Sequence, residues 1–284
     1  MKAKFAPFGA LLSGRRVLKK LLGIFIVLAL TVGCATVTKE ASKTSAHSEV
    51  GHYQIQSKIP GDTAKRALSV YLPEDYKTSG ASYPVLYLIH GPDGNNLTFL
   101  GGGYGGWMSD ANVSVIVDRL VQEGRIKPLI VACPDVSSAR LFDEYVPRDV
   151  VTFVDRTFRT IRNRESRAIA GHSMGGLESL YVTLAHPEVF SIAGGFSSYG
   201  LESLMLKLDE LVKAHNQKSH TIRFWLYAGT NNQFGVTYPN RDFATALKEK
   251  DLPTEYIEDD GDDINKVAQR LGEYIEYLAG FLKW

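Results

Sequence analysis

One serine of this chain, Ser173, stands in a pattern that suits a catalytic nucleophile. Positions 171–176 read Gly-His-Ser-Met-Gly-Gly, between an apolar stretch at 167–170 that predicts a strand and a stretch up to His186 that predicts a helix. At such a strand-to-helix turn, called a nucleophile elbow, the serine hydroxyl is raised above the chain. The chemistry that this predicts for Ser173 is attack on an acyl carbon.

Two glycines and one backbone amide support this interpretation. Gly171 and Gly175 flank Ser173 at a distance of two residues, where a tight turn leaves no room for larger side chains. The N–H of Met174 would lie at the start of the helix, where it can donate to an oxyanion. The alternative is a small-residue turn formed by chance, which the predicted strand and helix on either side disfavour.

The surrounding sequence predicts an α/β domain that positions this turn. The expected strands lie at 66–72, 84–89, 128–132, 167–170, 189–193 and 221–227. The expected helices lie at 109–122, 149–158, 174–186 and 264–283. Apolar strands that alternate with amphipathic helices indicate a mostly parallel sheet with helices on both faces.

Composition and charge exclude several classes of function. The chain has 284 residues, 44% of them hydrophobic, which is enough for one large core. Lys and Arg number 32 against 31 Asp and Glu, and no basic block suggests a nucleic-acid partner. The glycine-rich stretch 101–106 does not directly follow a strand, and the acidic run 258–263 lacks the spacing of an EF-hand, so we expect no cofactor, no metal and a solvated acidic loop.

The N-terminus predicts export and a lipid anchor. Basic residues precede an apolar run at 21–30, which is typical of a signal peptide. The run ends in Thr31-Val32-Gly33-Cys34, which resembles a bacterial lipobox, although that motif usually has an aliphatic residue in place of Thr31. We expect a signal peptide at 1–33, lipidation of Cys34, a tether at 34–49 and a domain at 50–284.

This interpretation places the protein outside the cytoplasm, held by lipid to the cell membrane or the outer membrane. The alternative is an uncleaved membrane anchor, but the apolar stretch is short for a span of roughly 20 residues. With Cys34 lipidated, Cys133 has no intrachain partner and is expected to be a small buried hydrophobic residue.

Five blocks of the sequence, taken in order, resemble one known family. They are Val70-Tyr71-Leu72-Pro73, the stretch 83–91, Ile130-Val131-Ala132-Cys133-Pro134-Asp135, the stretch 167–176 and His186-Pro187-Glu188-Val189-Phe190-Ser191. The chain is similar, over most of residues 60–280, to the Putative esterase family of the α/β-hydrolase fold, which includes esterase D, feruloyl and enterochelin esterases and the antigen 85 mycolyltransferases. The resemblance implies an α/β-hydrolase fold, no cofactor and a carboxylic-ester substrate on a small molecule or a carbohydrate.

Three positions depart from the family pattern. The second oxyanion donor of the family follows His90-Gly91, but Pro92 has no N–H, so the donor would shift to Asp93 or Gly94. Asn232 stands where the resemblance implies the acid of the triad. Asp262 stands where it implies the catalytic histidine, and no histidine follows His220.

Two residues are candidates for the missing base. His90 ends a strand at the carboxyl edge of the predicted sheet, where catalytic groups gather, although in the family this histidine looks structural. Asp262 is the second candidate, but a carboxylate is a weak base unless burial raises its pKa. Tyr104 and Trp107, in the glycine-rich loop, either contact the substrate or belong to a flexible surface loop.

The sequence therefore supports three hypotheses. The first is a serine esterase with an incomplete triad. The second is a catalytically inactive binding or scaffold lipoprotein with the same fold. The third is an acyltransferase, which would need the same missing base.

Overall fold

The structure, a computed structural model, describes residues 48–91, 106–108, 111–136, 142–216, 220–232, 234–261 and 263–284. Cys34, Asp93, Tyr104 and Asp262, four of the residues singled out in the sequence, lie outside these ranges. Within the described ranges, none of the helices combines the length and the apolar character needed to cross a membrane.

The domain is built on one eight-stranded sheet, with the strand order β1-β2-β4-β3-β5-β6-β7-β8. The strands are β1 (Glu49–Gln56), β2 (Lys65–Leu72), β3 (Val85–Ile89), β4 (Ile130–Pro134), β5 (Arg167–His172), β6 (Ile192–Phe196), β7 (Arg223–Gly229) and β8 (Thr254–Asp259). The β1–β2 and β2–β4 pairs are antiparallel, and every pair from β4 to β8 is parallel. The mostly parallel sheet predicted from the sequence is confirmed.

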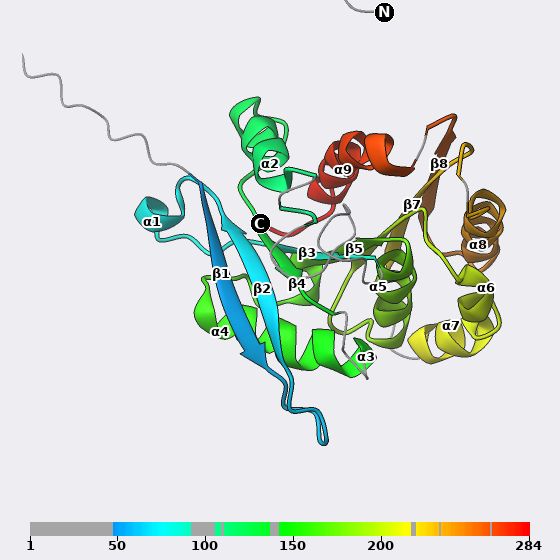
Figure 1. The fold of residues 1–284 in the computed structure, drawn as a ribbon, viewed down its shortest axis with the longest axis horizontal. Helices are drawn as coiled ribbons and strands as arrows, with labels where there is room; N and C mark the ends of the chain where they lie inside the picture. The colour runs from blue at the N-terminus through cyan, green and yellow to red at the C-terminus, as the bar shows by residue number, and fades with distance from the viewer. Residues whose placement is uncertain are drawn as a thin grey trace, which may run out of the picture. The chain divides into compact units, whose positions relative to one another are not determined.

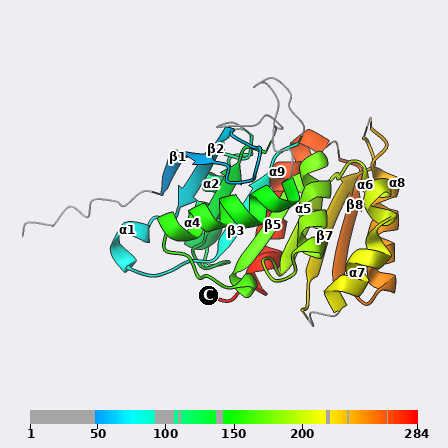
Figure 2. The same cartoon turned by 90° about the horizontal axis from the view of Figure 1, so that it is seen from below.

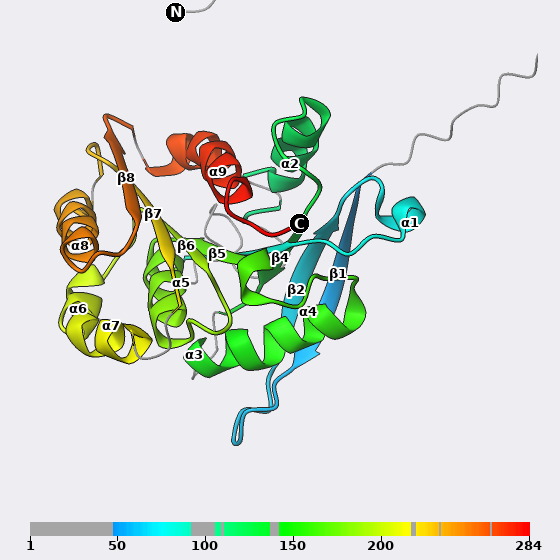
Figure 3. The ribbon, with the colours of Figure 1, turned by 180° about the vertical axis from the view of Figure 1, so that it is seen from behind.

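Helices cover both faces of the sheet (Figure 1). The longer ones are α2 (Val113–Gln122), α4 (Val151–Thr157), α5 (Met174–Ala185), α7 (Leu208–Asn216), α8 (Thr237–Glu249) and α9 (Asp263–Ala279). The short ones are α1 (Tyr76–Ser79), α3 (Phe142–Glu144), the π-helical turn Tyr145–Val150, the 3₁₀ turn Arg164–Ser166 and α6 (Leu201–Met205). Helices α2 and α9 pack on one face, and α4 to α8 pack on the other (Figures 1 and 3). In Figure 2 the helices α4, α5 and α7 lie in front of the strands.

The core explains why the central strands are almost wholly apolar. All residues of β3, β4, β5 and β6 are buried, because helices shield both faces. Cys133 of β4 is buried as predicted, and burial raises the pKa of its thiol.

The structure corrects the prediction for Trp107. This side chain is only 2% exposed, and its ring lies 5.8 Å from the ring of Phe196 in an aromatic cluster with Trp225 and Tyr274. Trp107 is therefore a core residue rather than a surface contact for substrate, because this cluster fills the space between the sheet and α9.

The strand directions define a carboxyl edge and an amino edge of the sheet. Strands β3 to β8 run parallel, so their carboxyl ends share one edge, where Ser173 follows β5. Strand β2 runs the other way, since Leu68 pairs with Pro134 at the carboxyl end of β4. Glu49 pairs with Leu72, so the described part of the chain begins at the amino edge, opposite Ser173.

Candidate functional site

Ser173 occupies a strained turn between β5 and α5. Its backbone angles are φ 57° and ψ −122°, a region that residues with a side chain rarely adopt. Four backbone hydrogen bonds hold the turn. The N–H of Ser173 donates to Phe196 O over 2.9 Å, and its carbonyl oxygen accepts from Gly176 N at 3.0 Å, Tyr199 N at 3.1 Å and Leu177 N at 3.3 Å. The predicted nucleophile elbow is thus present, and such strain is characteristic of functional sites.

Close backbone contacts explain the two flanking glycines. A Cβ on Gly171 would lie 2.2 Å from the carbonyl oxygen of Gly175. A Cβ on Gly175 would lie 2.3 Å from the carbonyl oxygen of His90, at the end of β3. Neither position accepts a side chain, so the geometry accounts for the spacing seen in the sequence.

The start of α5 supplies a donor for an oxyanion. Met174 is the first residue of this 12-residue helix, so its N–H has no acceptor within the helix. The helix dipole adds partial positive charge at the same end. Its side chain is 40% exposed, so the elbow lies at the surface. Met174 thus begins α5, and its role as an oxyanion donor stays a prediction, whereas Asp93 lies outside the described residues.

His90 is held by groups other than Ser173. Its Nδ1 lies 2.6 Å from Gly91 O, and the N–H of Val136 donates to its Nε2 over 3.0 Å. Asp135 lies 3.5 Å from the same Nε2. Burial alone would lower the pKa of His90, but Asp135 and Gly91 raise it above its usual value. These contacts tie the end of β3 to the end of β4, and a role as base would require His90 to give up the bond from Val136.

The other described histidines include His52 of the edge strand β1, whose Nδ1 lies 3.1 Å from Ser69 Oγ, and His215 of α7. His172 precedes the nucleophile but is buried, and burial lowers its pKa to about 4, so it is uncharged at neutral pH. His186 ends α5 beside Glu188, and His220 precedes β7, both at the amino edge as expected. In the described part of the chain, no side chain forms a hydrogen bond with Ser173 Oγ.

Asn232 helps to form a turn after β7. Its Oδ1 accepts a hydrogen bond from the N–H of Phe234 at 2.7 Å. This bond shapes the loop after β7, where the resemblance implied the acid of the triad. Among the residues that the structure describes, no three His, Cys, Asp or Glu side chains gather as metal ligands would.

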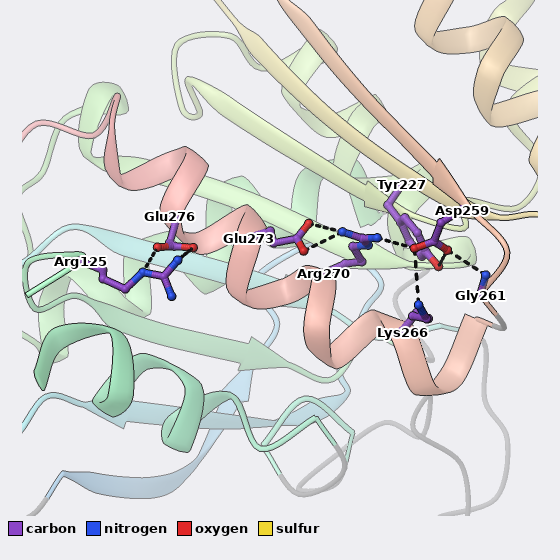
Figure 4. Close-up of polar contacts among 8 residues, drawn as sticks. All are labelled: Arg125, Tyr227, Asp259, Gly261, Lys266, Arg270, Glu273 and Glu276. Carbon is purple, nitrogen blue, oxygen red and sulfur yellow. Dashed lines mark hydrogen bonds and ion pairs between the residues drawn. The ribbon is translucent and has the colours of Figure 1, made fainter. Parts of the chain in front are cut away.

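A network of charged side chains at the end of β8 was not predicted from the sequence (Figure 4). Asp259 Oδ1 accepts from Tyr227 OH at 3.0 Å and from Gly261 N at 2.8 Å, and its Oδ2 accepts from Arg270 of α9. Arg270 also donates to both oxygens of Glu273 over 2.6 Å. The interpretation of the whole run 258–263 as a solvated acidic loop was wrong for Asp259, because this carboxylate fixes β7 and β8 to α9.

Replacing Asp259 by asparagine is expected to lower the free energy of unfolding at neutral pH by about 1.5–3 kcal/mol, the usual range for hydrogen bonds to a charged group. Burial would raise the pKa of Asp259, but Arg270, Gly261 and Tyr227 lower it overall. A carboxylate whose pKa is lowered by folding stabilises the protein at pH values above its pKa in the unfolded chain. This stabilisation is lost as the pH falls through the pKa of the group in the folded protein. The stability gap between wild type and Asp259→Asn should therefore close in acid.

Urea unfolding at several pH values measures this gap. Asp242→Asn is the matched control, since Asp242 is exposed and forms no ion pair or hydrogen bond with the described residues. A gap that persists unchanged at pH 2 would contradict the assignment of the effect to the Asp259 charge.

A second unexpected carboxyl is Glu178, on the flank of α5. It lines a cavity of about 290 Å³ together with Phe142, Leu177, Tyr181 and Leu204. Burial raises the pKa of Glu178 to about 7, and the nearby charge of His90 lowers it only in part. The side chain has no hydrogen-bond partner among the described residues, which explains why the neutral form is favoured.

The neutral substitution Glu178→Gln is expected to stabilise the protein at pH 8 by about 1–3 kcal/mol and to have little effect at pH 4. A carboxyl group whose pKa is raised by folding does not lower the stability at pH values below its pKa in the unfolded chain, near 4.3. As the pH rises from there towards the pKa in the folded protein, the stability falls, because the unfolded chain releases the proton more easily. Thermal unfolding across this range measures the effect, with the exposed Glu202→Gln as control. Equal stability of wild type and Glu178→Gln at pH 8 would refute the shift.

Comparison with known proteins extends these observations. The family model named Putative esterase matches residues 63–263. The chain is 32% identical over 142 residues to an endo-1,4-beta-xylanase/feruloyl esterase of Xylanibacter ruminicola, which covers 44% of this chain and 18% of that protein. It is also 32% identical to an esterase of Mycobacterium tuberculosis over 147 residues. This aligned region covers 46% of this chain and 28% of that protein. The matched part thus spans less than a third of these relatives.

Solved structures share the fold over most of the chain. A ferulic acid esterase superposes with a TM-score of 0.69 at 21% identity, covering 84% of this chain and 99% of that one. The S-formylglutathione hydrolase FrmB of Staphylococcus aureus superposes with a TM-score of 0.65 at 19% identity, covering 82% and 99%. Since the family model covers 201 of the 284 residues, the chain belongs to the Putative esterase family, and its fold is the α/β-hydrolase fold.

Proposed function

We propose that this chain is a serine carboxylic-ester hydrolase that works without a complete Ser-His-Asp triad. The observation that carries the proposal is the strained backbone of Ser173, φ 57°, kept by glycines that admit no side chain. Such strain costs about 1–3 kcal/mol and persists where the surroundings enforce it, most often at active sites.

The reaction follows from the position of the hydroxyl. Ser173 Oγ attacks the ester carbonyl carbon, and the negative charge that forms on the carbonyl oxygen is stabilised by the N–H of Met174. The serine proton passes to a base, the C–O bond to the alcohol breaks, and the alcohol leaves with a proton. Water then attacks the acyl-serine, releasing the carboxylic acid and restoring the hydroxyl of Ser173.

The proposed substrates are esters of small molecules or carbohydrates. Support comes from relatives: a ferulic acid esterase of Anaeromyces mucronatus was solved with ferulic acid, and a feruloyl esterase module of Clostridium thermocellum was solved with sinapinate. Both ligands are the acid products of ester cleavage.

Labelling with a fluorophosphonate tests the nucleophile directly. The probe forms a covalent bond only with an activated serine, and peptide mass spectrometry locates it. We expect one adduct, on Ser173, and none in Ser173→Ala. An unlabelled wild-type protein that also fails to hydrolyse p-nitrophenyl esters would refute the proposal.

The second candidate function is a binding or scaffold protein that has kept the fold but lost the chemistry. It is favoured by Asn232, which forms a turn, and by the absence of any described hydrogen-bond partner for Ser173 Oγ. Acyl transfer to a second substrate, as in the antigen 85 proteins, is the third candidate and depends on the same base. Unlabelled Ser173 together with tight binding of an intact ester would favour the second candidate.

We further propose that the protein is exported and lipid-anchored at Cys34. The support is the basic and apolar sequence before this residue and its lipobox-like ending. The proposed tether at 34–49 leads into β1, which begins at the amino edge of the sheet. Cys34→Ser should move the protein from the membrane fraction to the soluble fraction after cell lysis, provided that the signal is still cleaved, and an unchanged membrane fraction would contradict lipidation.

A further inference from the structure

A second cavity lies at the amino edge of the sheet, opposite the Ser173 turn. Its volume is about 370 Å³, and its walls come from the 3₁₀ turn before β5, the starts of β6 and β7, and the C-terminal segment. The residues that carry the argument are Arg164, Ser191, His220, Thr221, Arg223 and Phe281. None of them belongs to the machinery described for ester hydrolysis.

One of the two arginines in this cavity already has partners in the domain for all of its side-chain nitrogens. Arg164 donates to the carbonyl oxygens of Pro187 at 2.5 Å, Thr221 at 2.8 Å and Phe190 at 3.2 Å. Its remaining nitrogen lies 3.3 Å from Glu165, the one carboxylate among the described residues that line the cavity. Arg164 therefore fixes the wall and balances the charge of Glu165.

The other arginine has no such partners. The guanidinium of Arg223 lies 4.0 Å from the centre of the Phe281 ring, which holds it by stacking. Within the described residues Arg223 forms neither a side-chain hydrogen bond nor an ion pair, and the nearby Glu255 of β8 is also outside ion-pair distance. Its five N–H donors are left for a ligand or solvent.

His220 and Thr221 add further donors next to Arg223. Neither side chain has a hydrogen-bond partner in the described part of the chain. The cavity therefore offers hydrogen-bond donors from an imidazole, a hydroxyl and a guanidinium, while the charge of Glu165 is already balanced by Arg164. These donors suit the oxygen atoms of a tetrahedral oxyanion.

We propose that this cavity binds a phosphate group, with Arg223 as its main ligand. The phosphate could come from free inorganic phosphate or from the head group of an anionic phospholipid. We favour the lipid head group, because β1 begins with Glu49 at the same edge of the sheet as the cavity. This choice rests on the proposed lipid anchor.

Calorimetric titration of the full chain in a non-ionic detergent tests the cavity with two soluble probes, inorganic phosphate and glycerophosphoglycerol, the head group of phosphatidylglycerol. We expect saturable binding of at least one probe, and about tenfold weaker binding by Arg223→Gln, as the loss of a charge-assisted contact implies. His220→Gln should weaken binding by a smaller factor. Binding of inorganic phosphate alone identifies the free anion, whereas binding of glycerophosphoglycerol identifies the lipid head group.

Two controls keep the test specific. Lys248→Gln removes a positive charge from an exposed position on α8 and should leave binding unchanged. Ser173→Ala should also bind as wild type does, so that failure of the esterase proposal stays distinguishable from failure of this one. The proposal is overturned when neither probe binds, when folded Arg223→Gln binds as tightly as wild type, or when Lys248→Gln weakens binding as much as Arg223→Gln.

Discussion

Ser173→Ala is expected to abolish the part of short-chain p-nitrophenyl ester hydrolysis that passes through an acyl-enzyme, a fall of about tenfold or more. A residual rate above that in buffer is expected to remain, because the oxyanion hole and substrate binding alone give serine hydrolases with a disabled triad about 10³–10⁴ over water. Alanine removes the nucleophile while the Met174 N–H stays in place, so no acyl-enzyme can form. The rate of p-nitrophenolate release, with both proteins purified in parallel, measures the effect.

The pH dependence of the wild-type rate identifies the base. An imidazole base would give a rate that levels off above its pKa, which for His90 is raised above the usual value near 6.5. His90 already accepts the N–H of Val136, so we expect instead a rate that keeps rising between about pH 6 and pH 9. A plateau that His90→Gln abolishes would contradict this expectation and identify His90 as the base. Equal rates for wild type and Ser173→Ala would remove the serine from the mechanism.

The central fold could be predicted because burial leaves a clear mark on the sequence. Strand β3 is apolar along its length, and β5 is apolar between Arg167 and His172, since helices cover both faces. The glycines at 171 and 175 mark a turn that needs them. The edge strand β8 reads Thr-Glu-Tyr-Ile-Glu-Asp and escaped prediction, because only one neighbour pairs with it and its side chains are mostly half-buried.

The remaining errors concern residues whose surroundings depend on distant parts of the chain. Trp107 follows a glycine-rich stretch that is typical of a surface loop, yet Phe196 and its neighbours enclose it. Asp259 and Arg270 meet because α9 follows β8 after a short turn and packs over β6 and β7, an arrangement that no local spacing reveals. The raised pKa of Glu178 likewise arises from packing against α3 and α6, both too short to be predicted with confidence from sequence.

Gly175→Ala is expected to destabilise the fold by about 3 kcal/mol or more, at or beyond the upper end of the usual cost of overpacking. The new Cβ would lie 2.3 Å from His90 O and 2.5 Å from Ile89 O. Both are backbone atoms at the end of a central strand, so they cannot rotate away as a flexible side chain would. Relief requires α5 to move from β3, which would also displace Ser173 and the Met174 N–H. We therefore expect loss of both stability and fluorophosphonate labelling.

Gly272→Ala in α9 separates this clash from the general effect of replacing a glycine. A Cβ there would meet its nearest atom, in Ile116, at 3.7 Å, which is ordinary contact. Alanine favours the helix over glycine by about 1 kcal/mol, so Gly272→Ala should stabilise the protein slightly. Urea unfolding of both variants compares the two outcomes. A Gly175→Ala protein as stable as Gly272→Ala would mean that the elbow tolerates a side chain, and the glycine spacing would then lose its value as a sign of a catalytic serine.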